Sequence, residues 1–351
     1  MTSRPLAAVA LLLGLTALMA GLSGGPQTAL AAPGNAAVCD QAQAFSAARR
    51  GVSVLVLKNG QTVCEGYAGD GGPDRGWELW SGTKSFNGLI AAAAVQDGLL
   101  NLDEKVADTL PEWRTDPLKA QVTVRQLLQL VSGLEGSVGR APDHAAAIAA
   151  PVNAAPGSRF QYGAEPFQVF AAVMNRKLAS ARTGDADIIA YLKRRILDPI
   201  GVQWTGWRRT RGGDAMMPQG AIFTARQWAG FGEFVRGGGK VDGRAIVDPQ
   251  AFAALSVGTS ANPAYGLTWW LPRAGGRGPR TASVDFADHA AELPADMVIA
   301  AGAGDQRLYV IPSCGLTVVR QAELGLRRRR RGGEVWSDYA FLKPILVAWC
   351  G

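Results

Sequence analysis

The chain has 351 residues, of which 48% are hydrophobic and 19% are charged, with 44 glycines and 4 cysteines. It is too apolar for a disordered chain, its glycines lack the period of three that collagen needs, and its cysteines are too few for a small disulfide scaffold. His144 and His289 are the only histidines and no C-x-x-C occurs. We therefore expect no metal and no cofactor.

The net charge of +7 comes mostly from one run of five arginines, Arg327, Arg328, Arg329, Arg330 and Arg331. Without them, the chain has 31 basic and 29 acidic residues. This near balance does not predict nucleic-acid binding. The run itself is interpreted as a solvated loop, or as a contact with an anionic surface such as lipid headgroups or envelope polymer.

Residues 1–31 have the pattern of a secretory signal peptide. Arg4 precedes an apolar stretch from Leu6 to Leu22, and Ala29-Leu30-Ala31 is an A-x-A cleavage site. An uncleaved membrane anchor is the alternative, but the stretch is shorter than the ~20 residues that span a bilayer. No later segment is apolar enough to span. We expect a mature chain of 32–351, exported to a periplasm or released.

The mature chain alternates strand-like and helix-like segments in a definite order. We expect a helix at 40–50, a hairpin of strands 52–58 and 61–67 around Asn59-Gly60, and a helix from Ser81 to Asp97. Further helices are predicted at 122–134, 165–179, 186–197 and 224–236, strands at 264–271, 297–301, 306–312 and 315–321, and a last helix at 335–349.

Strands at both ends with helices between them predict an α/β architecture with one sheet. The sheet lobe would comprise 40–80 and 255–351, and an all-helical lobe would comprise 81–254. A cleft between two such lobes is a natural place for chemistry.

The four cysteines allow three pairings. The lengths of the predicted helices and strands place Cys64 at the same height along the fold as Cys39, and Cys350 at the same height as Cys314. We predict the disulfides Cys39–Cys64 and Cys314–Cys350, each contributing about 2–4 kcal/mol to stability. Buried free thiols are the alternative.

Ser81-Gly82-Thr83-Lys84 is an S-x-x-K element at the start of a predicted helix. Residues three apart on a helix share a face, so the Lys84 amine can reach the Ser81 hydroxyl. A serine needs such a base to act as a nucleophile, and a lysine serves when its pKa is depressed. The motif is short, and a capping serine followed by a solvent-facing lysine would give the same letters.

The context of the motif extends over most of the chain. The segments WSGTKSFNGLIAAAAVQDGLLNLDEKVADTLPEW, VTVRQLLQLVSGL, PGSRFQYGAEPFQVFAAVM, YGLTWW and GAGDQRLYVIP follow one another in order. Together they resemble the serine-hydrolase family of class C β-lactamases, penicillin-binding carboxypeptidases and related esterases. The resemblance implies a β-lactamase/transpeptidase-like fold, with Ser81 as nucleophile, Lys84 as its base and Tyr162 as a proton relay. Without it, Tyr162 would be interpreted as a core aromatic.

Two departures from the family pattern bear on the substrate. Y-x-N becomes Tyr162-Gly163-Ala164, and K-T-G is replaced by the segment Gly302-Ala303-Gly304-Asp305-Gln306. Both favour an ester or a small amide over a β-lactam as substrate. We predict an oxyanion hole from the N–H groups of Ser81 and Ala303. Substrate contacts are predicted at Trp80, Tyr265, Gly302 and Gly304.

Other catalytic arrangements are weaker. Gly21-Leu22-Ser23-Gly24-Gly25 matches G-x-S-x-G, but it lies in the segment removed on export. His144 and His289 lie in polar or alanine-rich stretches and are expected on loops. The sequence therefore predicts an exported serine hydrolase acting through an acyl-enzyme. A penicillin-binding or β-lactam-hydrolysing enzyme and an inactive cell-wall or peptide-binding protein are the alternatives.

Overall fold

The computed structural model describes residues 1, 33–273, 285–286, 288–325 and 335–351. The predicted signal peptide, the G-x-S-x-G match and the arginine run 327–331 fall outside these residues, apart from Met1, and stay predictions. Among the described residues, none of the helices is both long enough and apolar enough to cross a membrane.

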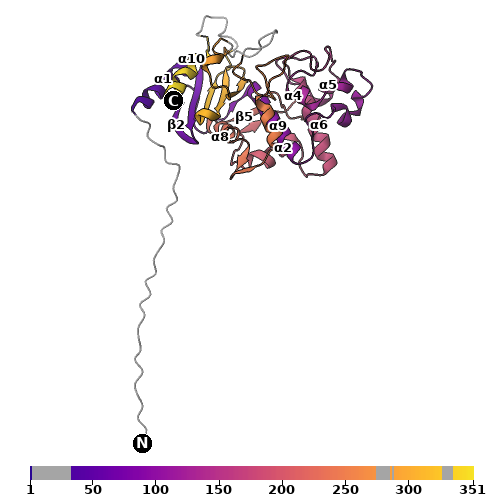
Figure 1. The fold of residues 1–351 in the computed structure, drawn as a ribbon, viewed down its shortest axis with the longest axis horizontal. Helices are drawn as coiled ribbons and strands as arrows, with labels where there is room; N and C mark the ends of the chain where they lie inside the picture. Colours follow the sequence, from indigo (N-terminus) through magenta and orange to yellow (C-terminus); the bar gives the residue numbers. More distant parts are fainter. Residues whose placement is uncertain (2–32, 274–284, 287, 326–334) are drawn as a thin grey trace.

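The centre of the fold is a five-stranded antiparallel sheet in the order β2-β1-β10-β9-β8. Two strands come from the start of the chain and three from its end. This confirms the predicted sheet built from both termini, and Figure 1 shows it at one end of the molecule with the helical region at the other. The strands are β1 (Gly51–Lys58), β2 (Gln61–Tyr67), β8 (Val298–Gly302), β9 (Gln306–Ile311) and β10 (Leu316–Ala322).

The β1–β2 hairpin turns at Asn59 and Gly60, as predicted. Their φ angles are 50° and 80°. Two central residues with positive φ match the twist of the flanking strands, and Asn-Gly is the pair that tolerates this conformation best.

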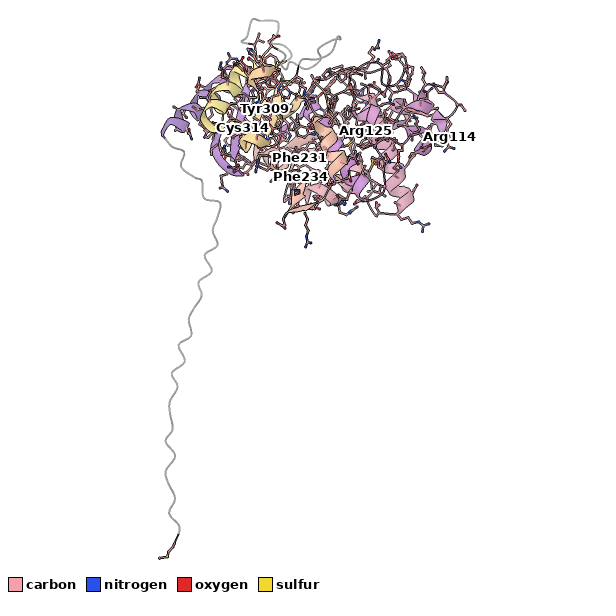
Figure 2. The ribbon with its side chains drawn as sticks, viewed as in Figure 1. Arg114, Arg125, Phe231, Phe234, Tyr309 and Cys314 are labelled. Carbon is pink, nitrogen blue, oxygen red and sulfur yellow. A yellow bond between two sulfur atoms is a disulfide. The ribbon has the colours of Figure 1, made fainter. Side chains whose placement is uncertain are left out.

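Both faces of the sheet are covered, so strands β1, β8, β9 and β10 are buried at nearly every position. Alternate residues of the strands enter different cores, because successive side chains point to opposite faces. One core contains Leu55, Leu57, Leu308, Val310 and Val319 together with Phe231 and Phe234 of helix α8 (Ala225–Arg236). The other contains Val54, Val56, Tyr309, Ile311 and Cys314 together with residues of α1 (Pro33–Ala48) and α10 (Asp338–Trp349) (Figure 2).

Helix α8 lies directly on the sheet, although it falls within the range 81–254 predicted for the helical lobe. A Cβ on Gly232 would come within 2.6 Å of Thr317 Cγ2 and 2.7 Å of Leu308 Cδ1. The missing side chain is what lets this helix approach strands β9 and β10 so closely.

The structure joins Cys39 to Cys64 and Cys314 to Cys350, the two pairings that were predicted, with Cα–Cα distances of 5.3 and 4.6 Å. The first bond ties α1 to β2, and the second ties the end of α10 to the turn before β10. Both therefore fasten covering helices to the same side of the sheet.

The helical region surrounds α2, most of whose residues are buried. Its helices and the short strands beside them are α2 (Lys84–Gln96), α3 (Val106–Thr109), α4 (Val124–Leu128), α5 (His144–Ala149), α6 (Glu165–Ala181), α7 (Ile188–Leu192), α9 (Pro249–Ala253), β3 (Trp77–Glu78), β4 (Gly206–Trp207), β5 (Ala221–Phe223), β6 (Lys240–Val241) and β7 (Arg244–Ala245). Single turns of 3-10 helix lie at Trp80–Thr83, Pro111–Trp113, Lys119–Gln121, Ala254–Ser256, Ala290–Glu292 and Pro312–Cys314, and a π-helical turn lies at Lys193–Leu197.

Two sequence predictions are wrong in this region. The helix expected at 122–134 ends at Leu128, because Leu130 adopts a φ of 59° and Gly133 one of 79°. The strand expected at 264–271 is a folded-back loop, in which Trp270 bridges both Tyr265 and Ile299. The apolar letters of both segments signalled burial correctly, but burial does not specify the backbone.

Candidate active site

The predicted nucleophile lies in a single turn between a short strand and a buried helix. Leu79 donates its N–H to Ala221 O of β5 (2.9 Å), and the turn Trp80–Thr83 leads into α2. Trp80 has a φ of 49°, which is unusual for a bulky residue and costs conformational energy. Such strain fixes the orientation of the next residue, Ser81.

Lys84 places its amine against Ser81. Its Nζ lies 3.2 Å from Ser81 Oγ and donates a second hydrogen bond to Pro218 O at 3.0 Å. The residue is only 4% exposed. The S-x-x-K spacing therefore brings amine and hydroxyl within hydrogen-bond distance, which a solvent-facing lysine would not do.

Burial changes the proton affinity of this amine. Loss of hydration lowers the pKa of Lys84 to about 7, and the more distant charge of Glu165 opposes the change. A large fraction of the amine is therefore neutral near pH 7 and can accept a proton from Ser81.

The carbonyl that holds Lys84 belongs to a fixed segment. Met217 accepts a hydrogen bond from Asn87 Nδ2 (3.1 Å) and donates one to Gln168 Oε1 (2.9 Å). Sequence analysis missed both amides. Their only signal in the sequence was that each is a polar residue on an otherwise apolar helix face, Asn87 in α2 and Gln168 in α6.

Tyr162 completes the cluster. Its hydroxyl is close enough to the Ser81 side chain for the two to interact, and its ring centroid lies 4.8 Å from Lys84 Nζ. Burial raises the pKa of Tyr162 to about 12, and the interaction with Ser81 opposes this rise. The phenol is therefore protonated at neutral pH and can donate. The ring is stacked on Trp270, with 5.9 Å between centroids.

Glu165 is a buried carboxylate that the sequence analysis did not single out. It accepts hydrogen bonds from Ser137 N at 2.8 Å, Ser137 Oγ at 2.5 Å and Ala164 N at 3.1 Å. These bonds hold the loop around Ser137 against the segment that carries Tyr162. Its negative charge also acts on Lys84 through space.

The turn between β8 and β9 closes the other side of the nucleophile. A Cβ on Gly302 would lie 2.1 Å from Leu79 O and 3.0 Å from Gly82 N, so only glycine fits beside the Ser81 turn. Gly304 and Asp305 have φ angles of 77° and 64°. Ala303, the predicted donor to the oxyanion, is exposed at the tip of this turn.

A buried set of charges supports this turn. Arg307 Nε lies 2.6 Å from Asp338 Oδ1, and its Nη1 donates to Gly302 O at 3.3 Å. Asp305 lies 3.5 Å from Arg50 Nη2, and its carbonyl accepts from Arg320 Nη1 at 2.7 Å. Sequence analysis missed Arg307 and Arg320, because an arginine in a strand usually faces water.

The other predicted contacts fall in different places. Trp80 lines two hollows, of about 330 and 420 Å³. Tyr265 is only 1% exposed and packs on Trp270, with 4.8 Å between ring centroids, so it supports the Tyr162–Trp270 stack from behind. Ala164, in place of the family's asparagine, packs against Ala141 and Met216.

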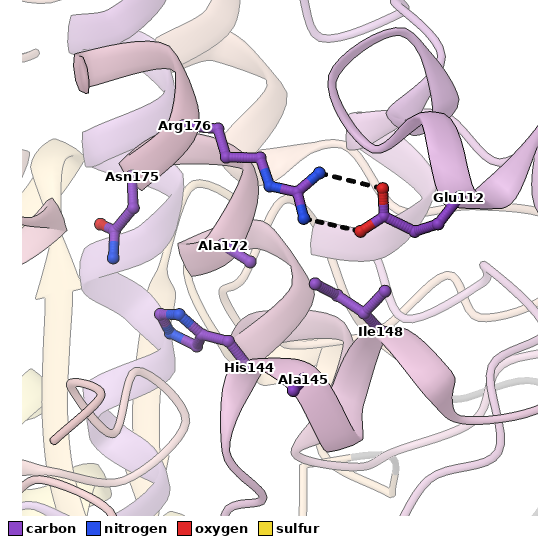
Figure 3. Close-up of a pocket in the computed structure, with 7 residues that line it drawn as sticks. All are labelled: Glu112, His144, Ala145, Ile148, Ala172, Asn175 and Arg176. Atoms are coloured by element: carbon purple, nitrogen blue, oxygen red, sulfur yellow. Dashed lines mark hydrogen bonds and ion pairs between the residues drawn. The ribbon is translucent and has the colours of Figure 1, made fainter. Parts of the chain in front are cut away.

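The two histidines are bound to carboxylates. His144 Nδ1 lies 3.2 Å from Asp214 Oδ1, and His289 Nδ1 lies 3.2 Å from Glu292 Oε1. His144 lines a separate hollow of about 410 Å³, where Arg176 and Glu112 form a two-pronged ion pair (Figure 3). Within the described ranges, no group of three or more His, Cys, Asp and Glu could hold a metal ion.

The fold and the Ser81–Lys84–Tyr162 cluster together define a class of protein. Its members have a β-lactamase/transpeptidase-like fold in which a serine and a lysine lie one helical turn apart. The family model for Beta-lactamase matches residues 31–320. The chain therefore belongs to the beta-lactamase family, whose members are serine hydrolases.

Known relatives are distant. Protein flp of Staphylococcus aureus (strain COL) is 24% identical over 181 residues, covering 46% of this chain. The match spans only 35% of the length of that relative. Protein flp of strain MRSA252 is 30% identical over 98 residues, covering 25% of this chain and 20% of the relative.

Solved structures share the fold at low identity. EstCE1, a hydrolase with promiscuous acyltransferase activity, has a TM-score of 0.67 at 16% identity, covering 91% of this chain and 100% of the other. A penicillin-binding protein homolog from Caulobacter crescentus has a TM-score of 0.63 at 19% identity, and the match covers 84% of this chain and 93% of the other. A D-stereospecific amidohydrolase from Streptomyces sp. has a TM-score of 0.61 at 16% identity, and the match covers 90% of this chain and 98% of the other.

Proposed function

We propose that this protein hydrolyses a small-molecule ester, or a small amide, through an acyl-enzyme on Ser81. One observation carries the proposal: the buried Lys84 amine, with a pKa lowered to about 7, lies 3.2 Å from Ser81 Oγ. A neutral amine at that distance is a base ready to activate the hydroxyl.

In the first half of the reaction, Ser81 Oγ attacks the carbonyl carbon and its proton passes to Lys84 Nζ. The N–H groups of Ser81 and Ala303 donate hydrogen bonds to the developing oxyanion. As the carbon–oxygen bond of the ester breaks, Tyr162 gives its phenolic proton to the departing alkoxide. The phenolate then recovers a proton from Lys84.

In the second half, water replaces the alcohol. It attacks the acyl carbon while its proton is taken up by the Tyr162–Lys84 pair, and the bond to Ser81 Oγ breaks. The protons return along the same route, so enzyme groups end as they began.

An ester fits the site better than a β-lactam. Ala164 carries no side-chain amide to bind an amide of the substrate, and it is packed against Ala141 and Met216. The β8–β9 turn offers backbone N–H groups and a buried Asp305 in place of K-T-G. An ester, whose leaving group needs the least assistance, makes the smallest demand on such a site.

The test is intact-mass detection of a fluorophosphonate adduct on the wild type, on Ser81→Ala and on Ser180→Ala, an exposed serine at the end of α6. The proposal expects one adduct on the wild type and on Ser180→Ala, and none on Ser81→Ala. Turnover of p-nitrophenyl butyrate but not nitrocefin supports the esterase assignment, and nitrocefin turnover would favour the β-lactam alternative. No adduct on folded wild type would favour the inactive binding protein.

We also propose that the protein works outside the cytoplasm, after cleavage following Ala31. The charged start, apolar stretch and A-x-A site of residues 1–31 support this, and the two disulfides are compatible with an oxidising compartment. Mass spectrometry of the protein from fractionated cells tests it. A new N-terminus near Ala32 in the exported fraction is expected, and an intact Met1 in the cytoplasmic fraction would refute it.

A further inference from the structure

A hollow of about 420 Å³ opens next to the nucleophile turn, and four arginines line it. We call it the arginine hollow. Its lining residues used below are Trp80, Gln219, Arg140, Arg208, Arg209 and Arg211. The arginines come from two places, the loop before α5 and the loop after β4, and no acidic residue is among the lining residues.

The lining of the arginine hollow includes residues from three segments that adjoin parts of the catalytic cluster. Trp80 directly precedes Ser81, and Gln219 directly follows Pro218, whose carbonyl holds Lys84 at 3.0 Å. Ala141 and Met216, which also line it, pack on Ala164, two residues after Tyr162. A molecule in this hollow therefore contacts Trp80 and Gln219, the chain neighbours of the reacting serine and of the carbonyl that holds its base.

Two of the four arginines are neutralised and two are not. Arg208 pairs with Glu78 at 3.2 Å, and Arg209 pairs with Asp187 at 2.6 Å. Arg140 and Arg211 are exposed, and neither has a carboxylate within 4 Å in the part of the chain that the structure describes.

Nearby acids do not pair directly with these two charges. The neighbouring Thr210 side chain and the Gly212 N–H, which donates a hydrogen bond to Asp143 at 3.1 Å, hold the pKa of the Asp143 carboxyl low, ahead of the attraction of Arg140. Asp143 thus offsets the Arg140 charge only in part and from beyond 4 Å, and Asp214 is bound by the backbone and ring of His144. The arginine hollow therefore keeps two guanidinium groups without a directly bound carboxylate.

We propose that the preferred substrates carry a carboxylate, which Arg140 and Arg211 hold in the arginine hollow while Ser81 attacks the ester. The inference rests on the proposed function. Guanidinium groups bind carboxylates in a planar, two-pronged geometry, and a cleft lined by one sign of charge raises the local concentration of the opposite ion. The volume suits a small molecule and not a polymer. Arg208, 5.4 Å above the Trp80 ring, keeps the wall of the hollow in place.

Two matched substrate pairs test the proposal. In the first pair, 4-acetoxybenzoate carries a carboxylate on the leaving group and its methyl ester is the neutral equivalent. In the second pair, the 4-methylumbelliferyl monoester of adipic acid carries a carboxylate on the acyl group and its methyl-capped form is the neutral equivalent. After correction for intrinsic reactivity, we expect kcat/KM to favour the charged member of at least one pair by about tenfold, and this preference to shrink in 0.5 M salt.

Variants assign the preference to the two arginines. Arg140→Gln and Arg211→Gln should each reduce the charged-to-neutral ratio about threefold, and the double variant should nearly abolish it. Arg244→Gln, which removes an exposed charge from strand β7, should leave the ratio unchanged. Equal kcat/KM within both pairs, or a ratio that the double variant does not change, would overturn the proposal.

A binding measurement separates this inference from the proposed function. Calorimetric titration with adipate requires no turnover, and adipamide is its neutral control. Adipate binding that the double variant weakens supports the arginine hollow even if Ser81 takes no fluorophosphonate. Labelling of Ser81 and turnover of neutral esters, without adipate binding or charge preference, would leave the hydrolase proposal intact and refute this one.

Discussion

Two buried cations support the nucleophile and the neighbouring β8–β9 turn, and they behave differently. Lys84 has a hydroxyl and a backbone carbonyl as hydrogen-bond partners, and burial lowers its pKa to about 7. Arg307, equally buried, contacts Asp338 at 2.6 Å, and although its burial acts to lower the pKa, the carboxylate overcomes this and raises it. Burial alone therefore does not decide whether a cation keeps its proton; the partner does.

This difference separates chemistry from support. An amine that loses its proton near neutral pH can take part in proton transfer. A guanidinium held by a carboxylate stays charged, and its remaining donors fix the backbone of the β8–β9 turn. The following predictions test this division.

Lys84→Met should produce the largest effect on activity. It removes the base and leaves Ser81 with the phenol alone, so kcat/KM for an ester should fall by about 10³- to 10⁴-fold. The free energy of unfolding should be kept or rise, because a buried amine is replaced by an apolar side chain of similar length. Ester assays and urea unfolding measure both, with Lys240→Met, on the exposed β6 strand, as control. Loss of folding together with activity would contradict the assigned role.

Asp338→Asn should have the largest effect on stability. It leaves the buried Arg307 with only the more distant carboxylate of Asp305, at 3.8 Å, as a counter-charge, which costs about 3–5 kcal/mol in the free energy of unfolding. The double variant Arg307→Met/Asp338→Leu should recover most of the loss, because a well-packed apolar pair can replace a buried ion pair. Unfolding curves in urea decide this, and equal loss in both variants would show that the charges act independently.

The pH profile of kcat/KM should rise about tenfold per pH unit below about 7 and level off above it. The sign follows from Lys84, since the neutral amine is the active form and the protonated form predominates below its pKa of about 7. Tyr162, with a pKa near 12, stays protonated throughout this range. A profile that is flat from pH 5 to 9 would exclude Lys84 as the base.

Asp305→Asn should have the smallest effect. Asparagine tolerates the φ of 64°, but it removes the charge facing Arg50 and Arg307 and so loosens the turn that carries Ala303. We expect kcat to fall about tenfold with little change in KM, because oxyanion stabilisation acts in the transition state. Glu323→Gln, just after β10, is the matched control. A change in KM alone would place Asp305 in substrate binding.

The sequence was informative where neighbours in the chain determine the structure. The Asn59-Gly60 turn, the Ser81–Lys84 spacing and both cysteine pairs follow from local geometry, and all three appear in the structure. The roles of Tyr162 and Ala303 were taken from a resemblance. The structure places Tyr162 against Ser81, whereas the oxyanion role of Ala303 stays a proposal.

The sequence was uninformative where a distant partner determines the state of a residue. Arg307 and Asp338 look like surface residues until α10 covers β9, and Glu165 looks like an ordinary first-turn acid until Ser137 meets it. Arg140 and Arg211 are far apart in the chain, so no local pattern predicts the hollow they share. The wrong predictions at 122–134 and 264–271 have the same origin, since tertiary contacts override the local preference of an apolar segment.

The two disulfides give the molecule an uneven response to mechanical load. Helices α1 and α10 are each cross-linked to the sheet, and both lie on the side away from α8 and the nucleophile turn. Tension applied through either helix would be borne by covalent bonds and by strands β2 and β10 before it reached Ser81. Attachment of the protein to a solid support through α1 or α10 should therefore leave the surroundings of Ser81 undistorted.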